Sequence, residues 1–300
     1  MSAPVILAAT STKGGVGKTT LLANISAVLA DIGLRVLMVD ADVQPSLSKY
    51  YPLSYRAPHG IVELLLGDNS DANVRSTVSH TVFPNLDIIV SNNISADIQT
   101  KIANRADRAF LLKAKLQNPF FQNNYDVILI DTQGAVGPLQ DAAAFASGCL
   151  ITPIMPEILS AREFVTGTQE ALARLAQGEV MGLAMPQLRA VIYAQDRSKD
   201  AKLIAQEIRE FFSASLDDRK KLLQTHVPEA KSYKEAATLR VPVHCHEQTH
   251  PGKLMPAYEV IHNIVYEIFP GIKERELRGS CFNDMSTLLP EENRAAEVQS

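Results

Sequence analysis

The sequence is poor in cysteine and has no long apolar run, and each shortage excludes a class of protein. Its three cysteines, Cys149, Cys245 and Cys281, are too few and too scattered for a disulfide framework and suit a reducing cytosol. No stretch approaches the roughly 18–20 apolar residues that a membrane span needs. The first residues lack a basic segment, and the apolar run after them is too short for a signal peptide. We therefore expect a cytoplasmic protein without a membrane partner.

The sequence also lacks an excess of positive charge. Its 29 Lys and Arg against 33 Asp and Glu give a net charge of −4, so any surface that binds nucleic acid must be local. Internal repeats and low-complexity tracts are absent as well. A chain of 300 residues that is 46% hydrophobic can bury a substantial core, and one α/β domain with a tail fits its length as well as two small domains.

Apolar runs alternate with helical patterns along most of the chain. Strands are expected at 5–9, 35–39, 86–90, 127–130, 149–154, 189–194 and 222–227. Helices are expected at 108–116, 162–176, 200–212 and 257–268, and Gly33 is placed to end a first helix. This order predicts a doubly wound α/β fold, with a mostly parallel sheet covered by helices on both faces. The expected domain is 1–272, followed by an acidic tail or short helix at 273–300.

A glycine-rich segment joins the first expected strand to the first expected helix. Its backbone N–H groups, together with the positive end of the helix dipole, would point at one spot and hold phosphates. In such a loop Lys18 lies on the β- and γ-phosphates, and the Thr19 hydroxyl lies on Mg²⁺. The expected phosphate-binding residues are Lys13, Gly14, Gly15, Val16, Gly17, Lys18, Thr19 and Thr20.

The segment departs from the ordinary P-loop pattern in one respect. Thr12 stands where the first glycine of that pattern would fall, and a second lysine, Lys13, follows it. The string K-G-G-V-G-K-T-T resembles the deviant P-loop of the ParA/MinD group of ATPases. The resemblance implies that Lys13 reaches across a dimer interface to the partner's nucleotide.

Two aspartates, Asp40 and Asp42, follow the second apolar run. Ligands of doubly wound sheets gather at the carboxyl ends of the strands, which brings these carboxylates toward the phosphate loop. The segment resembles the D-x-D-P-Q element of the family, although Val43 stands where proline is usual. The resemblance implies that Asp42 orients the attacking water and that Asp40 supports the Mg²⁺ shell and Lys18. Taken alone, the pair would also fit a solvated turn at the end of a strand.

A third motif ends the run at 127–130. Asp131 is placed as the Walker B carboxylate, which holds a water bound to Mg²⁺. Gly134 follows with the spacing D-x-x-G, so that its amide could approach the γ-phosphate without a Cβ in the way. Related ParA proteins have D-T-P-P here, so Gln133 and Gly134 are departures in the switch region.

Weaker similarities to the family extend over roughly residues 4–270. Asn24 stands where the family has an asparagine in its first helix. The segment around Pro228 is similar to the family's adenine-side loop, which implies that Pro228 flanks the base. A proline after a strand is otherwise most often part of a turn.

Basic residues are denser between positions 197 and 240, with ten Lys and Arg against seven Asp and Glu. The ParA resemblance implies a non-specific DNA surface in this part of the chain, which a dimer would double. Any single residue here would equally fit a solvated helix face. The candidate DNA contacts are Arg219, Lys220, Lys221, Lys231 and Lys234.

These motifs lead to a ParA-like partition ATPase as the expected function. Two chains would close around two Mg·ATP, bind double-stranded nucleoid DNA and be released when a ParB-like centromere-binding partner stimulates a slow hydrolysis. Sequence-specific operator binding is not expected, because no helix-turn-helix precedes the P-loop.

Other functions fit parts of the pattern. A ParA-like protein that positions a protein complex would share every residue named so far. A MinD-like regulator of division would need a basic amphipathic helix, whereas 273–300 is acidic. An iron–sulfur reductase would need paired bridging cysteines. A metal site is a weak alternative for a small group of possible ligands, namely His244, Cys245, His246 and His250.

Overall fold

The computed structural model describes residues 3–272 and Phe282, apart from 12, 93–94, 135–136, 158–166, 168–172, 174, 177, 179–183, 250–251 and 253. These residues form a nine-stranded sheet in the order β3-β4-β5-β2-β6-β1-β7-β8-β9. The strands are β1 (Val5–Ala9), β2 (Val36–Ala41), β3 (Leu53–Tyr55), β4 (Val78–Thr81), β5 (Leu86–Ile89), β6 (Val127–Thr132), β7 (Cys149–Ile154), β8 (Gln187–Ile192) and β9 (Lys220–Leu222). From β5 to β9 every neighbouring pair is parallel, which confirms the predicted mostly parallel sheet.

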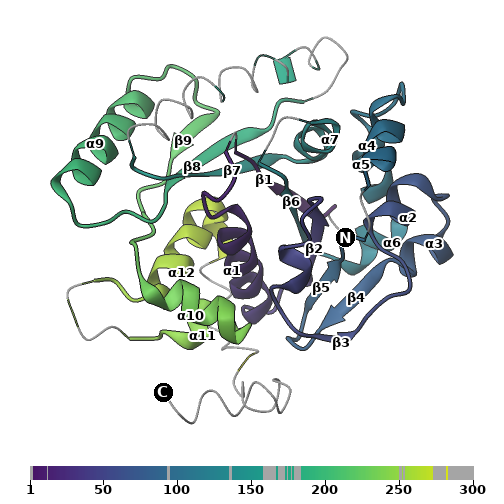
Figure 1. The fold of residues 1–300 in the computed structure, drawn as a ribbon, viewed down its shortest axis with the longest axis horizontal. Coiled ribbons are helices and arrows are strands. Elements are labelled where there is room, and N and C mark those ends of the chain that lie inside the picture. The colour runs from purple at the N-terminus through teal and green to yellow at the C-terminus, as the bar shows by residue number, and fades with distance from the viewer. Residues whose placement is uncertain are drawn as a thin grey trace.

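Helices cover both faces of this sheet (Figure 1). The described helices are α1 (Lys18–Asp31), α2 (Ile61–Leu66), α3 (Asp71–Arg75), α4 (Ala96–Ala103), α5 (Leu111–Leu116), α6 (Pro119–Asn124), α7 (Pro138–Ala146), α9 (Lys199–Ser213), α10 (Lys231–Leu239), α11 (Val243–His246) and α12 (Ala257–Ile268), with short 3₁₀ turns η1 (Leu47–Lys49) and η2 (Pro270–Ile272). None of these helices is long and apolar enough to cross a lipid bilayer.

Alternate side chains of each central strand enter two different cores, as the two-residue period of a strand requires. On β2, Met38 packs on the face covered by α1, α10, α11 and α12. Its neighbours Leu37 and Val39 pack on the face covered by α2 to α7. Helix α9 covers a third, smaller cluster with Ile192 and Ala190 of β8. The sheet is therefore buried on both sides.

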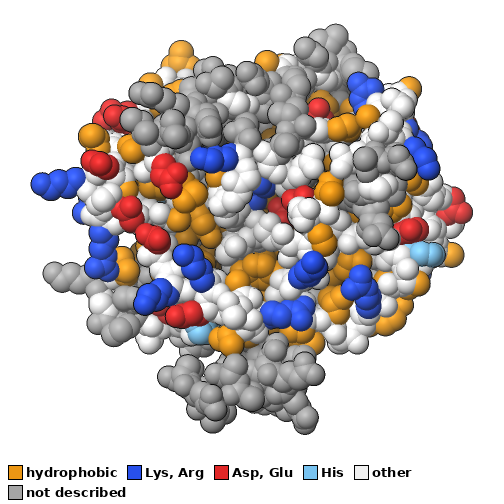
Figure 2. Space-filling model, in the orientation of Figure 1, with side chains coloured by type: hydrophobic (Ala, Val, Ile, Leu, Met, Phe, Trp, Pro, Cys, Tyr) orange, Lys and Arg blue, Asp and Glu red, His pale blue; other side chains and the backbone are white. Residues whose placement is uncertain are grey.

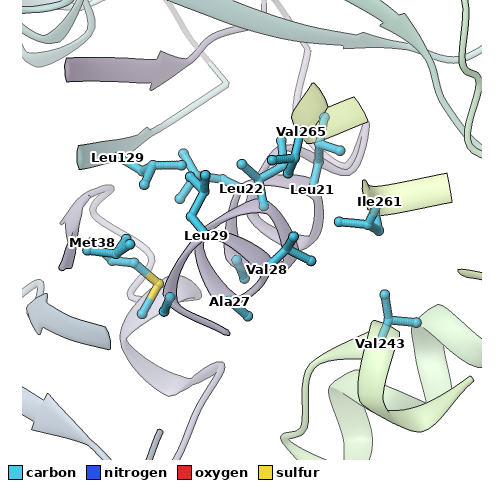
Figure 3. Packing of buried hydrophobic residues seen from close by; sticks show 14 of the residues in the cluster. Leu21, Leu22, Ala27, Val28, Leu29, Met38, Leu129, Val243, Ile261 and Val265 are labelled. Carbon is cyan, nitrogen blue, oxygen red and sulfur yellow. The ribbon is translucent and has the colours of Figure 1, made fainter. Parts of the chain in front are cut away.

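Helix α1 lies in the middle of the first core. Figure 3 shows its leucines between the sheet residues Met38 and Leu129 and the α12 residues Ile261 and Val265. All of its residues except two threonines near its start are buried. Gly33 follows the helix with φ +94°, which confirms the glycine expected at this end.

Two strands at one edge of the sheet were not predicted from the sequence. Strands β3 and β4 are three and four residues long and run antiparallel to their neighbours. The β4 sequence has a single apolar residue, Val78, followed by three polar ones, so it lacks the apolar run or alternation that would predict a strand.

Several predicted elements differ from the structure by one or two residues at an end, and two differ by more. The strand predicted at 222–227 occupies Lys220–Leu222 instead, because the amides of Gln224 and Thr225 turn away to the Glu267 carboxylate at 2.6 and 2.8 Å. The helix predicted at 108–116 begins only at Leu111. The helix predicted at 162–176 and the tail at 273–300 lie almost entirely outside the described residues.

One described residue of that tail packs in the first core. The Phe282 side chain is 3% exposed, and its backbone N–H donates to the Asp31 carboxylate at the end of α1 at 2.7 Å. Its ring lies 5.3 Å from that of Phe83. The predicted domain boundary at 272 stays a prediction.

Candidate functional site

The phosphate loop connects β1 to α1 at the carboxyl end of the central strand. Gly15 and Gly17 have φ of +77° and +91°, a left-handed conformation that glycine adopts without strain. A Cβ added at Gly14 or Gly15 would meet no atom within 4 Å. Helix α1 begins at Lys18, so its first N–H groups face this open space. The loop therefore has the shape of an anion cradle.

The two lysines of the loop differ in environment. Lys18 is 7% exposed, and its ammonium donates to the Ser11 hydroxyl at 2.9 Å. Burial lowers the pKa of Lys18, whereas the carboxylates of Asp131 and Asp42 act to raise it. The Ser11 hydroxyl in turn donates to the Lys13 carbonyl oxygen at 2.6 Å. Lys13 itself is exposed, so only Lys18 is enclosed by its own chain.

Asp131 and Thr19 form an oxygen-rich pair beside the loop. The Thr19 hydroxyl donates to Oδ2 of Asp131 at 2.6 Å. The other carboxylate oxygen, Oδ1, is buried and has no hydrogen-bond partner. Burial raises the pKa of Asp131 to about 6, although the Thr19 hydroxyl and the Lys18 ammonium act to lower it. A buried, unsatisfied carboxylate oxygen next to a hydroxyl fits Mg²⁺, which prefers oxygen ligands.

The two aspartates after β2 have different surroundings. Asp40 is fully buried and accepts hydrogen bonds from the backbone and hydroxyl of Ser48, at 2.7 and 2.6 Å, and from the amide of Asp42. Burial raises its pKa to about 7. Asp42 is half-buried, accepts from the Gln44 amide at 2.9 Å, and is close enough to influence Lys18. Asp40 thus shapes the turn that presents Asp42 to the loop.

Gly134 lies directly against the phosphate loop. A Cβ at this position would lie 2.7 Å from the Lys13 carbonyl oxygen and 2.8 Å from the Gly14 nitrogen. Gln140 of α7 also contacts the start of the loop, because its amide donates to the Thr10 hydroxyl at 3.0 Å and the Ser11 carbonyl at 3.1 Å. The segment after Asp131 is thereby joined to the loop at two points. The approach of the Gly134 amide to the γ-phosphate stays a prediction, and its packing against the loop backbone was not foreseen. Sequence reasoning also missed Gln140 and Ser11, which belong to no motif.

A cavity of about 310 Å³ opens beside the loop, and Pro228, the residue predicted to flank the base, forms part of its wall. Its wall includes Gly15, Gly17, Thr20, Tyr193, Val227, Pro228 and Tyr233. The ring of Tyr193 covers Gly17 so closely that a Cβ there would collide with it. Burial raises the pKa of both tyrosines, so their hydroxyls stay protonated. The cavity is apolar for the most part and adjoins the cradle, as a site for a nucleotide base would.

The five candidate DNA contacts fall into two groups. Arg219 immediately precedes β9 and Lys220 begins it, and they pair with Asp217 at 3.0 and 3.5 Å. Lys221 follows in the same strand and is exposed. Lys231 and Lys234 are exposed on α10, beside the cavity. Figure 2 shows Lys and Arg side chains spread over the lower half of the face in view, with Asp and Glu side chains among them.

The histidines near the end of α10 lie on the short helix α11. His244 is buried, with its ring 3.3 Å from an Asp31 carboxylate oxygen, and His246 is 3.5 Å from Glu235. His250 lies outside the described residues, and the residues that are described contain no group of three ligands able to hold a metal ion.

Known proteins resemble this chain in both sequence and structure. A family model described as AAA domain matches residues 5–175. The sporulation initiation inhibitor protein Soj of Bacillus subtilis is 29% identical over 79% of this chain and 89% of its own. Among solved structures, apo McdA of Cyanothece has a TM-score of 0.68 at 20% identity, covering 90% of this chain and 98% of its own. The septum site-determining protein MinD of Pyrococcus horikoshii, complexed with Mg-ADP, has a TM-score of 0.64 at 23% identity, with the same coverage of both chains.

Proposed function

This chain belongs to the AAA-domain family, among the P-loop ATPases of the ParA/MinD group, and from this premise we propose that it is a partition ATPase working as an ATP-dependent dimer. The observation that carries the proposal is the contrast between its two loop lysines. Lys18 is buried at the cradle, where it serves the nucleotide of its own chain, while Lys13 is exposed on the same loop. An exposed lysine at this place lies on a surface that a second chain with its own nucleotide can approach.

Each residue of the site has a role in this proposal. The loop amides and Lys18 bind the phosphates, and Thr19 and Asp131 hold Mg²⁺, which neutralises phosphate charge when bound. Asp42 orients the attacking water, and Asp40 supports it by fixing the turn through Ser48. Positioning and charge neutralisation are the main contributions to such a reaction, so hydrolysis is slow until a partner completes the site.

The proposed ligand beyond ATP is non-specific duplex DNA. Lys231 and Lys234 are better placed for phosphate contacts than Arg219 and Lys220, because an aspartate already pairs with the latter two. Dimerisation would double such a surface and make binding depend on nucleotide and on salt. A centromere-bound, ParB-like partner would then trigger hydrolysis and release the dimer from the nucleoid.

Light scattering after size-exclusion chromatography tests the dimer. With Mg²⁺ and a non-hydrolysable ATP analogue, the wild-type chain is expected to elute as a dimer, and with ADP as a monomer. Lys13→Ala should bind a fluorescent ATP analogue with nearly unchanged affinity yet stay monomeric, whereas Lys18→Ala should not bind it. Lys202→Ala, an exposed lysine of α9, is the matched control. Normal dimerisation of Lys13→Ala would contradict the cross-subunit role.

A gel-shift assay with random-sequence duplex tests the DNA surface. Binding is expected with ATP but not with ADP, and it should weaken at higher salt. The double variant Lys231→Ala/Lys234→Ala should bind less DNA than Arg219→Ala/Lys220→Ala, whose side chains already pair with Asp217. Binding to anionic vesicles rather than to DNA would favour a membrane-cycling protein instead.

A further inference from the structure

A second cavity, of about 460 Å³, lies at the opposite end of the sheet from the phosphate loop. Arg35 precedes β2 and Tyr125 precedes β6, whereas Asp40 and Asp131 lie near the far ends of the same strands. Six strand residues span roughly 20 Å, so this cavity is separate from the nucleotide site. The short helices α3 and α6, five and six residues long, contribute Arg75 and Phe120 to the wall of this cavity.

The one carboxylate that lines this cavity is already satisfied. The Tyr125 hydroxyl donates to Oδ2 of Asp87 at 2.8 Å, and the His80 ring lies 2.8 Å from Oδ1. His80 and Asp87 are directly opposed on β4 and β5, which fixes this pair in the wall. Asp87 therefore has little capacity left for a ligand cation.

The cavity contains two guanidinium groups in different states. Arg35 is already paired: its Nε and Nη2 donate to the two oxygens of the Asp126 carboxylate at 3.2 and 2.9 Å, and its Nη1 donates to the Asn123 carbonyl. Arg75 lies over the Phe120 ring, 4.6 Å from its centroid, and makes no ion pair within the described part of the chain. The Phe120 ring holds this guanidinium in place, and no carboxylate of the described residues neutralises its charge. Such a group is well suited to bind an anion.

Aromatic rings form much of the remaining wall. Tyr55 is 49% exposed and lies over the His80 ring at 5.4 Å between centroids. On the helical side, the rings of Phe120 and Tyr125 meet edge to face at 6.3 Å. Rings on both walls provide contact surface for a flat ligand.

From this arrangement we propose that the cavity binds a small anion carrying a flat ring, with its charge on Arg75 and its ring against Tyr55. Its volume is in the range of small-molecule sites. An aromatic carboxylate and a nucleoside monophosphate share this chemistry. Because the two sites lie at opposite ends of the sheet, both can be filled at once.

Isothermal titration calorimetry on the full chain tests the site, with the phosphate loop first saturated with Mg·ADP. The probes are guanosine monophosphate, indole-3-carboxylate, guanosine and inorganic phosphate. At least one ring anion should bind, and both guanosine and phosphate alone should bind at least about tenfold more weakly, because each lacks half of the recognised features. If guanosine monophosphate binds more tightly, the cavity recognises a phosphate group. If indole-3-carboxylate binds more tightly, the cavity recognises a carboxylate.

Two variants locate the binding. Arg75→Gln should weaken the ring anion about tenfold or more, while Arg108→Gln, another exposed arginine outside the cavity, should not. Tyr55→Ala should weaken the ring anions but leave inorganic phosphate unchanged. The proposal is overturned if neither ring anion binds, or if Arg75→Gln and Arg108→Gln bind alike.

Discussion

Gly134 and the phosphate loop are in contact through backbone atoms alone. The nearest atoms to its missing side chain are the Lys13 carbonyl oxygen and the Gly14 nitrogen, and neither can move without reshaping the loop. The glycine at this position therefore serves close packing, as well as any approach to a phosphate.

Gly134→Ala is expected to weaken Mg·ATP binding and to slow hydrolysis, each by about tenfold or more, because a Cβ would displace the Lys13–Gly14 backbone of the phosphate loop. Fluorescent-nucleotide titration and phosphate release measure the two effects. The control is Gly148→Ala, whose Cβ would meet no atom within 4 Å. Equal activity in the two variants would mean that the loop tolerates the displacement.

Three predicted site residues that the structure brings together, Lys18, Thr19 and Asp131, share one property: each lies near the end of a strand or belongs to the glycine-rich loop. Parallel strands bring such residues together whatever the details of the fold, so Lys18, Thr19 and Asp131 could be placed in advance. Ser11 and Tyr193 could not, because their roles depend on which side chain the folded chain brings beside them.

Helix α1 is joined to the rest of the first core by a buried asparagine. The Asn24 amide donates to the Tyr50 hydroxyl at 3.1 Å and to the Thr20 carbonyl at 2.8 Å, and its oxygen accepts from the Val243 amide at 2.8 Å. One side chain thus connects α1 to the segment after β2 and to α11. This gives a structural reason for the asparagine that the sequence comparison singled out.

Asn24→Leu should lower the free energy of unfolding by about 2–4 kcal/mol, because it leaves the Val243 amide buried without its partner. Urea denaturation of the nucleotide-free protein measures this. Ser26→Ala is the control: its hydroxyl bonds only to the Leu22 carbonyl in the same helix, so its loss should cost under about 1 kcal/mol. Similar costs for both variants would rule out a linking role for Asn24.

The predicted bounds match the structure at strands β1 and β7 and at helix α12, because apolar runs and a full helical period give strong signals. The fully buried strands β2 and β6 each extend two residues further than predicted at their carboxyl ends, because each ends in polar or small residues that the apolar pattern leaves out. The antiparallel edge was missed, since its strands depend on pairing with β5 rather than on their own sequence.

The molecule as a whole encloses two carboxylates whose charged forms are disfavoured. Burial raises the pKa of Asp40 to about 7 and of Asp131 to about 6, against about 3.9 in an unfolded chain. Because their pKa values are raised, both carboxyl groups stay protonated to a higher pH in the folded protein than in the unfolded chain. The contribution of these two groups to the free energy of unfolding is therefore full below about pH 4 and is lost as the pH rises through 6 and 7.

The nucleotide-free protein should accordingly lose about 2–4 kcal/mol of stability between pH 5 and pH 8. Thermal melts across this range measure the loss, and saturating Mg·ADP should reduce it because the cation favours the charged carboxylate. Asp131→Asn should flatten the profile, whereas the exposed control Asp218→Asn should not. A profile that is flat for the wild type would show that water reaches these carboxylates.

The near-complete enclosure of α1 has a consequence for genetic screens. Since every residue from Leu21 to Asp31 is buried, most replacements there would reduce the amount of folded protein and so mimic a loss of enzymatic activity. Variants recovered in this helix should therefore be assayed for abundance before any role in chemistry is assigned to them. Substitutions that spare folding while impairing turnover are instead to be sought among the loops that surround its first turn.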